Sequence, residues 1–558
     1  MNRGFRGLSA VGVVLAVALG ISACGGSSSS SSSGSPAQGR NGGEATLLMG
    51  TAPDFLDPQL AYTTQGAGPD WITYTPLLTY RHASGKQGAE LIPGLATALP
   101  AISSDGKTYT FQLRKGLTYS NGQPVNASDL EYSIRRAIKT SGGWGGKSFF
   151  TNYIVGAAAV DSGKAQKISG ITADDATGKI TIKLVKAYGA FSNVIAFPAA
   201  GLVPTGTKFT NLSNSPPPGV GPYIITAVQP NRTFTMVKNP KWASFAIPDV
   251  PEGHLQKITI TINSNTQAEA QQVLNNQADV FDPGDTLPPA LLGQIRSTAQ
   301  NRFAPVTIPS TFYFFMNTRL KPFNNVKVRQ AVNYALDKRA MARLASGFLK
   351  PECNFLPEGI VGHPTSCPYG DPNGAPDINK AKQLVQQSGL AGTPITVWGE
   401  MRSPRKEYVD YYTDVLNKLG FKATPKIISD STYFPTIGNE KTKAQTGFAD
   451  WIQDFPNPSD FYLLLDGTAI QATNNQNFSY VNDPKIQTEL AKLNPVPTSQ
   501  LNSVASQWQK LDEYVTSQAY EAVYGSEQVP KFQSTRMNFA ASTIHPLYLD
   551  DWVNLSLK

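Results

Sequence analysis

Charged side chains are scarce in this chain of 558 residues. They make up 16% of it, against roughly a quarter in a typical soluble protein. Lys and Arg number 48 and Asp and Glu 40, which gives a formal net charge of +8, and no cluster of basic residues is interleaved with aromatics. Both absences argue against a nucleic-acid binder. The hydrophobic fraction of 40% is ordinary for a folded globular protein and excludes a wholly disordered chain.

Residues that build common catalytic and metal sites are also few and scattered. The four histidines form no HExxH pattern, and no GxSxG occurs. The glycine-rich GGWGGKS at 142–148 lacks the first glycine of a phosphate-binding loop and follows a predicted helix, so we interpret it as a flexible loop. The adjacent pairs Asp174/Asp175 and Asp550/Asp551 are interpreted as solvated surface carboxylates. We therefore expect no catalytic residue, no metal and no cofactor, and a protein that is not an enzyme.

Long hydrophobic runs are absent apart from a short one near the N-terminus. Arg3 and Arg6 precede an apolar stretch, Leu8–Leu19, whose ~12 residues are too few for the ~20 that span a bilayer. Ile-Ser-Ala-Cys follows at 21–24 and resembles the bacterial lipobox, in which the cysteine thiol receives a lipid. We predict a signal peptide over residues 1–23 and lipidation of Cys24. The alternative is an ordinary signal peptide that leaves a free thiol.

The segment from 24 to 43 is dominated by glycine and serine. Such a composition cannot bury enough apolar area to fold, and as a random coil it spans ~25 Å. We interpret it as a tether. The protein is therefore expected to be exported and held by its lipid on the extracytoplasmic side of the cytoplasmic membrane, facing the periplasm or the cell surface.

Cysteine is rare, with three in the chain. Once Cys24 carries lipid, Cys353 and Cys367 remain, on either side of a loop rich in proline and glycine. A pair of cysteines in an oxidising compartment is most simply a disulfide, and closing a loop of this length stabilises the fold by ~3 kcal/mol. The alternative, a metal site with His363 between the cysteines, lacks a fourth ligand.

Apolar residues alternate in some segments and recur every three or four positions in others, which predicts both strands and helices. The predicted strands are 108–113, 180–184 and 258–262. The predicted helices begin near Asn126, Thr266, Asn325, Asp377 and Tyr408, and the last two end at Gly389 and Gly420. Strands and helices interleaved without a repeat indicate an α/β protein of several sub-domains.

Five segments, in order along most of the chain, are similar to the motifs of one known family. They are 91–138 (beginning IPGLATALPAISSDGKTYTFQLRKG), 219–239 (GVGPYIITAVQPNRTFTMVKN), 312–338 (FYFFMNTRLKPFNNVKVRQAVNYALDK), 376–390 (PDINKAKQLVQQSGL) and 451–461 (WIQDFPNPSDF). The chain thus resembles the family 5 extracellular solute-binding proteins, the dipeptide- and oligopeptide-binding lipoproteins of ABC transporters.

This resemblance implies a two-lobed α/β fold of the periplasmic-binding-protein type (class II), with a hinge that closes on the ligand. Lobe I would comprise residues 44–310, with an extra sub-domain at about 75–217. Lobe II would comprise residues 311–525, and residues 526–558 would return to lobe I.

The resemblance also assigns the ligand's amine to Asp454. This residue holds the place of the aspartate that pairs with the α-amine in the peptide-binding branches, and such charged pairs are strong when desolvated. Trp451 and Phe455 flank it and would wall the pocket. Tyr313 would face the ligand at the hinge.

Two further groups of site residues follow from the resemblance. Tyr62, Thr63 and Thr64 lie in a loop similar to the one whose backbone pairs with extended peptides. Trp398 is followed by Arg402, which would hold the ligand's carboxylate, although the spacing differs from that of the dipeptide-binding branch. The family's usual arginine and cysteine pair near these segments are missing.

The expected function is capture of short peptides, or of a related amine-bearing solute, and delivery to an ABC permease with its cytoplasmic ATPase. We expect a monomer, anchored to the membrane by lipid, that binds no nucleic acid. Within the same fold the ligand could instead be an oligosaccharide stacked on Trp398 and Trp451, a metal chelate or haem. A peptide-signal receptor without import is the other alternative, and a secreted enzyme would lack a nucleophile and base.

Overall fold

The computed structural model describes residues 39–141, 143–473 and 475–558. The predicted signal peptide, Cys24, most of the tether and Gly142 of the glycine-rich loop lie outside the described residues. The folded unit begins at Gly39, earlier than the predicted end of the tether at residue 43. Backbone hydrogen bonds explain this difference, because the Arg40 N–H donates to the Leu557 carbonyl over 3.1 Å and the Gly42 N–H to the His254 carbonyl over 2.7 Å.

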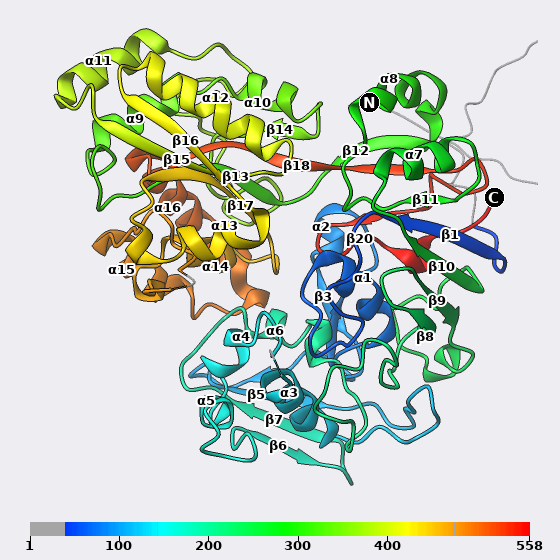
Figure 1. Ribbon diagram of the computed structural model, residues 1–558. Helices are drawn as coiled ribbons and strands as arrows, with labels where there is room; N and C mark the ends of the chain where they lie inside the picture. The colour runs from blue at the N-terminus through cyan, green and yellow to red at the C-terminus, as the bar shows by residue number, and fades with distance from the viewer. Residues whose placement is uncertain (1–38, 142, 474) are drawn as a thin grey trace, which may run out of the picture. The chain divides into compact units, whose positions relative to one another are not determined.

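A long strand, β18 (Glu521–Gln533), belongs to both halves of the main sheet. Its first half pairs with β13 (Ser310–Met316) and β14 (Leu349–Pro351). Its second half pairs with β12 (Phe303–Thr307) and β11 (Val280–Phe281). Figure 1 shows β18, coloured red, passing from one half to the other beside the β12–β13 connection. The fold is therefore two-lobed α/β, as expected, with two chain segments crossing side by side between the lobes.

The first lobe is built on the part of the sheet ordered β18-β11-β1-β10-β9-β8. β10 shows why these segments form strands, since its alternating sequence KITITI buries Ile258 and Ile260 and leaves the threonines facing outward. The elements of this lobe other than those around the smaller sheet described next, with η for 3-10 helices, are β1 (Glu44–Met49), α1 (Thr64–Thr73), β2 (Leu78–Tyr80), α2 (Gly85–Gly88), β3 (Leu91–Pro93), β8 (Tyr223–Gln229), β9 (Thr233–Lys238), η2 (Trp242–Phe245), β10 (Lys257–Ile262), α7 (Thr266–Leu274), α8 (Pro289–Thr298), η3 (Gln300–Arg302), β19 (Ile544–His545), β20 (Leu549–Asp550) and η8 (Trp552–Asn554).

A smaller antiparallel sheet, ordered β4-β5-β7-β6, lies within the region predicted as the extra sub-domain. Tyr109 and Phe111 on β5 face the same core as Ile180 and Ile182 on β7. This core is continuous with that of the first lobe. The elements here are β4 (Ala101–Ile102), β5 (Thr108–Gln112), α3 (Asp129–Lys139), α4 (Ser148–Thr151), α5 (Ala157–Asp161), β6 (Ile171–Asp174), β7 (Lys179–Lys183), α6 (Phe191–Val194) and η1 (Pro198–Ala200).

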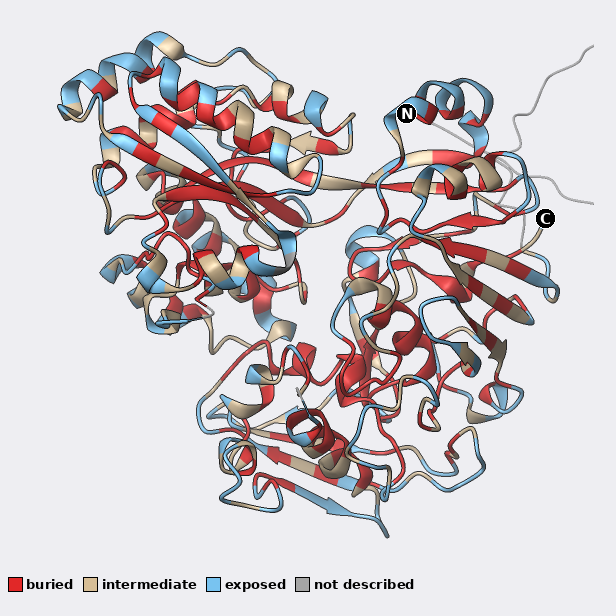
Figure 2. Cartoon of the chain, viewed as in Figure 1, coloured by how far each residue is buried: buried red, intermediate tan, exposed pale blue. Residues whose placement is uncertain are grey.

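The second lobe is built on the part of the sheet ordered β16-β15-β17-β13-β18, with helices packed against it. Its central strand β13, STFYFFM, is buried at every position, which is typical of a strand covered on both faces; Figure 2 shows it as buried. The remaining elements are α9 (Val326–Ala335), α10 (Lys338–Leu344), α11 (Ile378–Ser388), β15 (Pro394–Glu400), α12 (Arg405–Lys418), β16 (Lys422–Ile428), α13 (Asp430–Ile437), η4 (Glu440–Thr442), β17 (Thr446–Ile452), α14 (Pro458–Tyr462), η5 (Leu463–Leu465), η6 (Gly467–Ala469), α15 (Pro484–Leu493), η7 (Thr498–Val504) and α16 (Ala505–Gln518).

Helix ends test the predicted capping residues directly. The helix starts predicted at Asn325 and Asp377 are confirmed, since each side chain caps its helix by accepting a backbone N–H of the first turn. The cap predicted at Asn126 is wrong, because α3 begins at Asp129. The Asp129 carboxylate accepts the Asn126 N–H over 2.9 Å and is also bonded by Thr205, so a tertiary contact fixes where this helix starts.

The interpretation of Asp550 and Asp551 as solvated carboxylates is wrong. Both are buried, and Asp551 is 0% exposed. His82 explains this burial, because its ring Nδ1 lies 2.8 Å from Asp551 Oδ1 and the ring itself stacks on Trp71 with centroids 4.0 Å apart. His82, the partner that compensates for the burial of Asp551, is distant from it along the chain.

Cys353 and Cys367 form a disulfide, as predicted for a pair of cysteines in an oxidising compartment. The loop that they close packs into the second lobe's core through Phe355, Leu356 and Ile360. Within the loop, the Asn354 side chain donates to the Pro364 carbonyl over 2.8 Å and His363 Nδ1 bonds the Leu356 carbonyl over 2.7 Å. The His363 ring is therefore hydrogen-bonded to the backbone of its own loop rather than bound to a metal.

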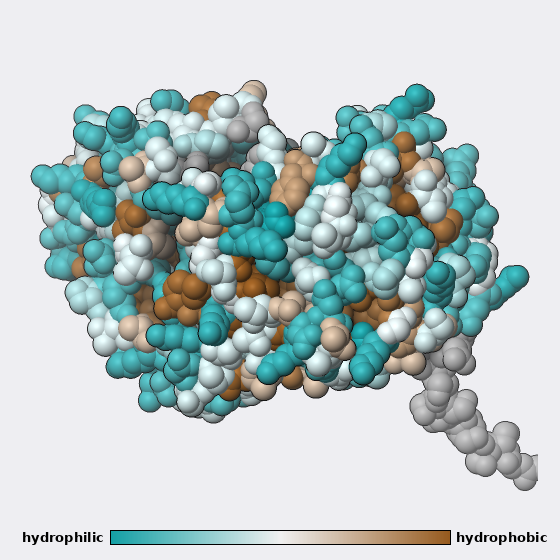
Figure 3. Space-filling model, turned by 90° about the horizontal axis from the view of Figure 1, so that it is seen from below, coloured by the Kyte–Doolittle hydropathy of each residue, from teal (hydrophilic) through white to brown (hydrophobic). Residues whose placement is uncertain are grey.

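Polar residues cover most of the face drawn in Figure 3, with apolar residues between them. Among the described residues, we find no helix with both the length and the apolarity that crossing a membrane requires.

A fully buried ion pair fastens the sub-domain helix α3 to the first lobe. Arg136 donates through Nη1 and Nη2 to the two carboxylate oxygens of Asp57, over 2.5 and 2.6 Å, and both side chains are 0% exposed. Its remaining donors bond to Gln59 and to the Lys208 and Thr210 carbonyls. All five N–H groups of the Arg136 guanidinium are therefore hydrogen-bonded, as the burial of this charged group requires.

We expect Arg136→Met to lower the free energy of unfolding by about 3–5 kcal/mol, because Asp57 would be left as an uncompensated buried charge. The neighbouring Arg135 offers a matched control, since it pairs with Glu131 one helical turn away and both side chains, unlike those of Arg136 and Asp57, are partly exposed. Arg135→Met should cost less than about 1 kcal/mol. Denaturant unfolding followed by circular dichroism measures both, and equal losses would contradict the assignment of α3's anchor to Arg136.

A candidate binding cavity between the two lobes

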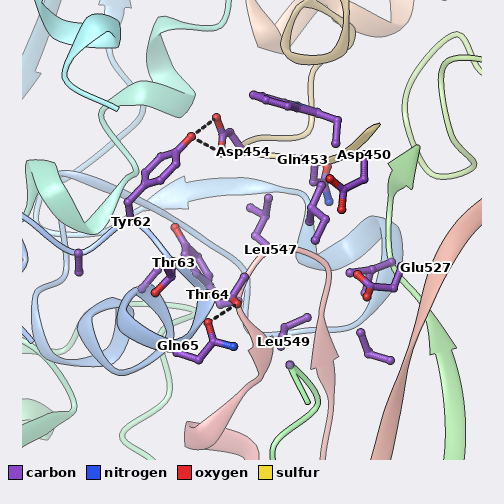
Figure 4. A pocket seen from close by; sticks show the side chains of 18 of the residues that line it. Tyr62, Thr63, Thr64, Gln65, Asp450, Gln453, Asp454, Glu527, Leu547 and Leu549 are labelled. Carbon is purple, nitrogen blue, oxygen red and sulfur yellow. Dashed lines mark hydrogen bonds between the residues drawn. The ribbon is translucent and has the colours of Figure 1, made fainter. Parts of the chain in front are cut away.

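A cavity of about 670 Å³ lies between the lobes. The first lobe contributes the loop before α1 and the loop that contains Leu547 and Leu549. The second lobe contributes the end of β17 with the residues that follow it, and β18 contributes Glu527 where it crosses. Figure 4 shows Tyr62 and Asp454 on one side of this space and Asp450 and Glu527 on the other.

Asp454 and Tyr62 meet across the cavity from opposite lobes. The Tyr62 hydroxyl lies 3.0 and 2.9 Å from the two carboxylate oxygens of Asp454, to which it donates. Tyr62 is 39% exposed, so this bond lies at the accessible surface of the cavity. The pair is a direct polar contact between the lobes, and it presents a carboxylate to anything that enters.

A second carboxyl group, that of Asp460, fixes the main chain at Asp454. Asp460 is buried and accepts the backbone N–H of Asp454 over 2.8 Å. Burial raises the pKa of Asp454 to about 7, while the Tyr62 hydrogen bond works against this rise. Burial and the nearby Asp454 raise the pKa of Asp460 well above its ordinary value. At neutral pH, Asp454 is therefore poised between its two forms.

The loop that carries Tyr62 is fixed by Asp54. Its carboxylate accepts the backbone N–H groups of Tyr62 and Thr63 over 2.9 and 3.2 Å, and the Thr63 hydroxyl over 2.8 Å. Tyr62, Thr63 and Thr64 all line the cavity. The N–H groups of Tyr62 and Thr63, however, are already bonded, so they are not free to pair with an extended peptide.

Arg405 forms the centre of a charged group on the second-lobe side. It pairs with Glu400 through one terminal nitrogen and with Asp450 through the other, over 2.5 Å in the second case. Burial alone would lower the pKa of Arg405, but Asp450 and Glu400 raise it above its ordinary value. Two carboxylates therefore satisfy this guanidinium.

Arg402 lines the same wall and is less engaged. Its side chain is 55% exposed, and its guanidinium lies 3.6 Å from Glu400. Its backbone N–H donates to Asp430 over 3.1 Å, which fixes the main chain beside the cavity. Of the two arginines that follow Trp398, Arg402 is the one with donors to spare.

The structure places three of the predicted site residues outside the cavity lining. Phe455 is buried in the first lobe's core, with its ring 5.6 Å from that of Phe149 and 6.2 Å from that of Phe197. Tyr313 is buried in the second lobe beside Phe355. Trp398 is buried on β15, with the Lys426 ammonium 4.2 Å from the centre of its ring. Apolar packing, rather than ligand contact, accounts for all three positions.

Sequence reasoning missed several lining residues, notably Asp450, Glu527 and Tyr548. Tyr548 stacks on the buried Trp71, with ring centroids 4.5 Å apart. A signal for Glu527 was present, since it is an acidic residue in a long strand beside the predicted crossing between residues 525 and 526. Among the described residues, no group of His, Cys, Asp and Glu could hold a metal ion.

Comparison with known proteins identifies the family. Residues 90–473 match the family model described as bacterial extracellular solute-binding proteins, family 5. The chain belongs to this family. Its resemblance to the family's motifs is thereby confirmed.

A curated relative is the glutathione-binding protein GsiB of Escherichia coli O1:K1, which is 26% identical over 369 residues, covering 63% of this chain and 66% of GsiB. The match thus spans just under two thirds of that relative's length. A second GsiB, from Pectobacterium atrosepticum, is 28% identical over 70% of this chain and 72% of its own.

The family 5 fold is also seen in solved structures. A protein titled clavulanic acid biosynthesis oligopeptide binding protein 2 superposes with a TM-score of 0.84 at 22% identity, covering 93% of this chain and 96% of its own. These relatives are binding proteins rather than enzymes, and the family is extracellular by description.

The buried carboxyl groups predict an unusual dependence of stability on pH. Burial raises the pKa of Asp454, Asp512 and Glu527 to about 7 and that of Glu269 and Asp550 to about 8. In the folded protein these groups hold protons that the unfolded chain releases near pH 4, so the free energy of unfolding falls as the pH rises from 6 to 8. Burial also lowers the pKa of Lys338 to about 7. Above pH 7 this one lysine makes the free energy of unfolding rise with pH, against the trend set by the five carboxyl groups.

We therefore expect the ligand-free protein to have a higher melting temperature at pH 6 than at pH 8, as measured by calorimetry in buffers of equal ionic strength. Asp454→Asn removes one of the titrating groups and should flatten the slope. A melting temperature that rises from pH 6 to pH 8 would contradict the burial of these carboxyls.

Proposed function

We propose that this family 5 protein captures short peptides, or a related amine-bearing solute, between its lobes and delivers them to the permease of an ABC importer with its cytoplasmic ATPase. Its relatives named for binding glutathione support a ligand that carries a free amine. The single observation that carries the proposal is the Asp454 carboxylate, which faces a cavity of about 670 Å³ from the position that the family resemblance assigns to the amine.

An ammonium group suits this position on physical grounds. Desolvation makes an unpaired carboxylate costly, and pairing with a cation in the same low-dielectric space removes that cost. The Tyr62 hydroxyl already shares its hydrogen bond between the two carboxylate oxygens of Asp454, so the orientation of this carboxylate is fixed before a ligand arrives. A bound ammonium would contact groups of both lobes, and contacts to both lobes favour their closed arrangement.

The opposite end of a zwitterionic ligand needs a cation, and Arg402 is proposed to supply it. Arg405 lines the cavity too, but Glu400 and Asp450 already neutralise it. Trp451 and Tyr548 add aromatic walls between the charged ends. The cavity's volume falls within the ~300–1,000 Å³ common for small-molecule sites.

The proposal includes the predicted export of the chain and its anchoring by lipid at Cys24, as a monomer on the extracytoplasmic side of the membrane. The lobe boundaries near residues 310 and 525 are likewise proposed, in accord with the change of β18's partners. Stacking of a sugar between Trp398 and Trp451 is disfavoured, because Trp398 is buried outside the cavity lining.

Removal of the charge at Asp454 tests the amine contact. We expect Asp454→Asn to weaken binding of tripeptides such as Ala-Ala-Ala by about ten- to a hundredfold, since the ammonium would lose its only ionised partner on that side. Isothermal titration calorimetry with the mature protein measures this. N-acetylation of the peptide removes the same interaction from the ligand, so the acetylated peptide should bind both proteins equally weakly.

Asp410→Asn is the matched control, because Asp410 lies on α12 outside the cavity and pairs with Lys406 at the surface. It should leave peptide affinity unchanged. If Asp454→Asn binds the free and the acetylated peptide as the unaltered protein does, Asp454 does not hold the amine. If no peptide binds the unaltered protein, peptides are not the ligand.

Peptide affinity should also depend on pH. The ionised form of Asp454 binds the ammonium, and with a pKa of about 7 this form is lost as the pH falls. The dissociation constant should therefore rise by about tenfold per pH unit below 7 and level off above it. Titrations at pH 5, 6, 7 and 8 measure this, and a constant affinity across that range would contradict it.

A further inference from the structure

A second, smaller cavity of about 110 Å³ adjoins the main one at the crossing between the lobes. Glu527, Arg402 and Arg405 line both cavities, so they stand at the junction. A water molecule occupies ~30 Å³ in the liquid. The smaller space therefore has room for a charged end group on a short arm, but not for a whole peptide.

The Glu527 carboxylate is the exceptional group at this junction. Its backbone is fully engaged, because its N–H donates to the Ser310 hydroxyl over 2.8 Å and its carbonyl accepts the Ile308 N–H over 3.1 Å. Its side chain, by contrast, has no hydrogen bond or ion pair within the part of the chain that the structure describes. The half-buried Glu527 carboxylate is thus held in place by its strand and remains available to accept hydrogen bonds from a ligand.

The charges around Glu527 do not neutralise it. Arg405 is shared between Glu400 and Asp450, and Arg402 lies nearest to Glu400. These two cations and two anions balance one another. Glu527 is left as a surplus negative charge at the mouth of the smaller cavity.

The interior of the smaller cavity suits a flexible arm with a cationic tip. Its lining includes the apolar side chains Leu287, Phe312, Phe348 and Leu349, which can cover methylene groups. It also includes Asp285, whose carboxylate accepts the Gly50 N–H with one oxygen. No lysine lines this cavity, and its arginines are the two already described.

We propose that this smaller cavity is a subsite for a second cationic group of the ligand, a guanidinium or ammonium on a flexible arm, which pairs with Glu527. The proposal rests on the proposed function and deepens it, because it assigns a net positive charge to the preferred ligand. In a peptide, the arm would be an arginine or lysine side chain, while Asp454 holds the α-amine.

The electrostatics of Glu527 agree with this assignment. Burial raises the pKa of Glu527 to about 7, an effect that Arg405 and Arg402 reduce and Asp450 increases. A bound cation would restore the ionised form, as pairing does for any desolvated carboxylate. A neutral arm of the same size could donate a hydrogen bond to Glu527 but would bring no positive charge to compensate the ionised carboxylate.

Two pairs of probes that differ only in charge test the subsite by calorimetry. Ala-Arg-Ala and Ala-citrulline-Ala are nearly isosteric tripeptides, and agmatine and N-carbamoylputrescine are the corresponding small amines. We expect the cationic member to bind about tenfold or more tightly than its neutral partner. Glu527→Gln should bring this ratio close to one, whereas Glu252→Gln, a surface variant outside both cavities, should leave it unchanged.

The outcomes separate this proposal from the proposed function. If both tripeptides bind equally and N-acetylation still abolishes binding, the peptide function stands and the subsite is overturned. If neither tripeptide binds, peptides are excluded, and the agmatine pair decides the subsite by the same ratio. A preference for the cation that persists in a folded Glu527→Gln variant also overturns it.

Discussion

The backbone ladder of β18 is the constraint on which the rest of this structure depends. A strand must satisfy its N–H and C=O groups along its whole length, and β18 does so with β13 and β14 in one lobe and with β11 and β12 in the other. The lobes therefore cannot separate without breaking a ladder, but they can bend where its partners change. The ladder also fixes the register, so Glu527 is held at the crossing; a slip of one residue would turn its side chain to the opposite face.

Buried carboxyl groups surround the crossing, and their cost explains how the site works. Each ionised carboxylate that loses water must gain a partner or a proton. Asp57 has gained Arg136, and Asp450 has gained Arg405. Asp454 and Glu527 have no cation of their own, and burial brings the pKa of each to about 7. Among the described residues, Asp512 and Glu269 are also buried without a cation, but neither lines the main cavity. Asp454 and Glu527 do line it, so a ligand can reach these two unpaired acids.

Local signals in the sequence predicted much of the fold, whereas tertiary partners decided the rest. Caps such as Asp377 act within one helical turn, so the sequence alone contains the whole interaction. The start of α3 and the burial of Asp551 depend on Thr205 and His82, which are distant along the chain. The same division holds in the site. Asp454 and Arg402 sit in recognisable motifs and line the cavity, but nothing local distinguishes an aromatic residue that packs in a core, as Phe455 does, from one that faces a ligand. Glu527 belongs to the site only because two ladders meet beside it.

In the ligand-free protein the Tyr62 hydroxyl already donates to the Asp454 carboxylate, and any ligand that binds there competes with this hydrogen bond. A hydrogen bond to a charged group contributes about 1.5–3 kcal/mol, and here it joins the two lobes in the absence of a ligand. A ligand that only replaced the Tyr62 hydroxyl would gain little, because it would lose one contact between the lobes as it formed another. Net affinity must come from an interaction that the empty protein lacks. An ammonium supplies one, since it adds a full positive charge beside Asp454 while the neutral Tyr62 hydroxyl can remain bonded to the other carboxylate oxygen. Selectivity for cations over neutral donors follows from the presence of that tyrosine rather than from the carboxylate alone.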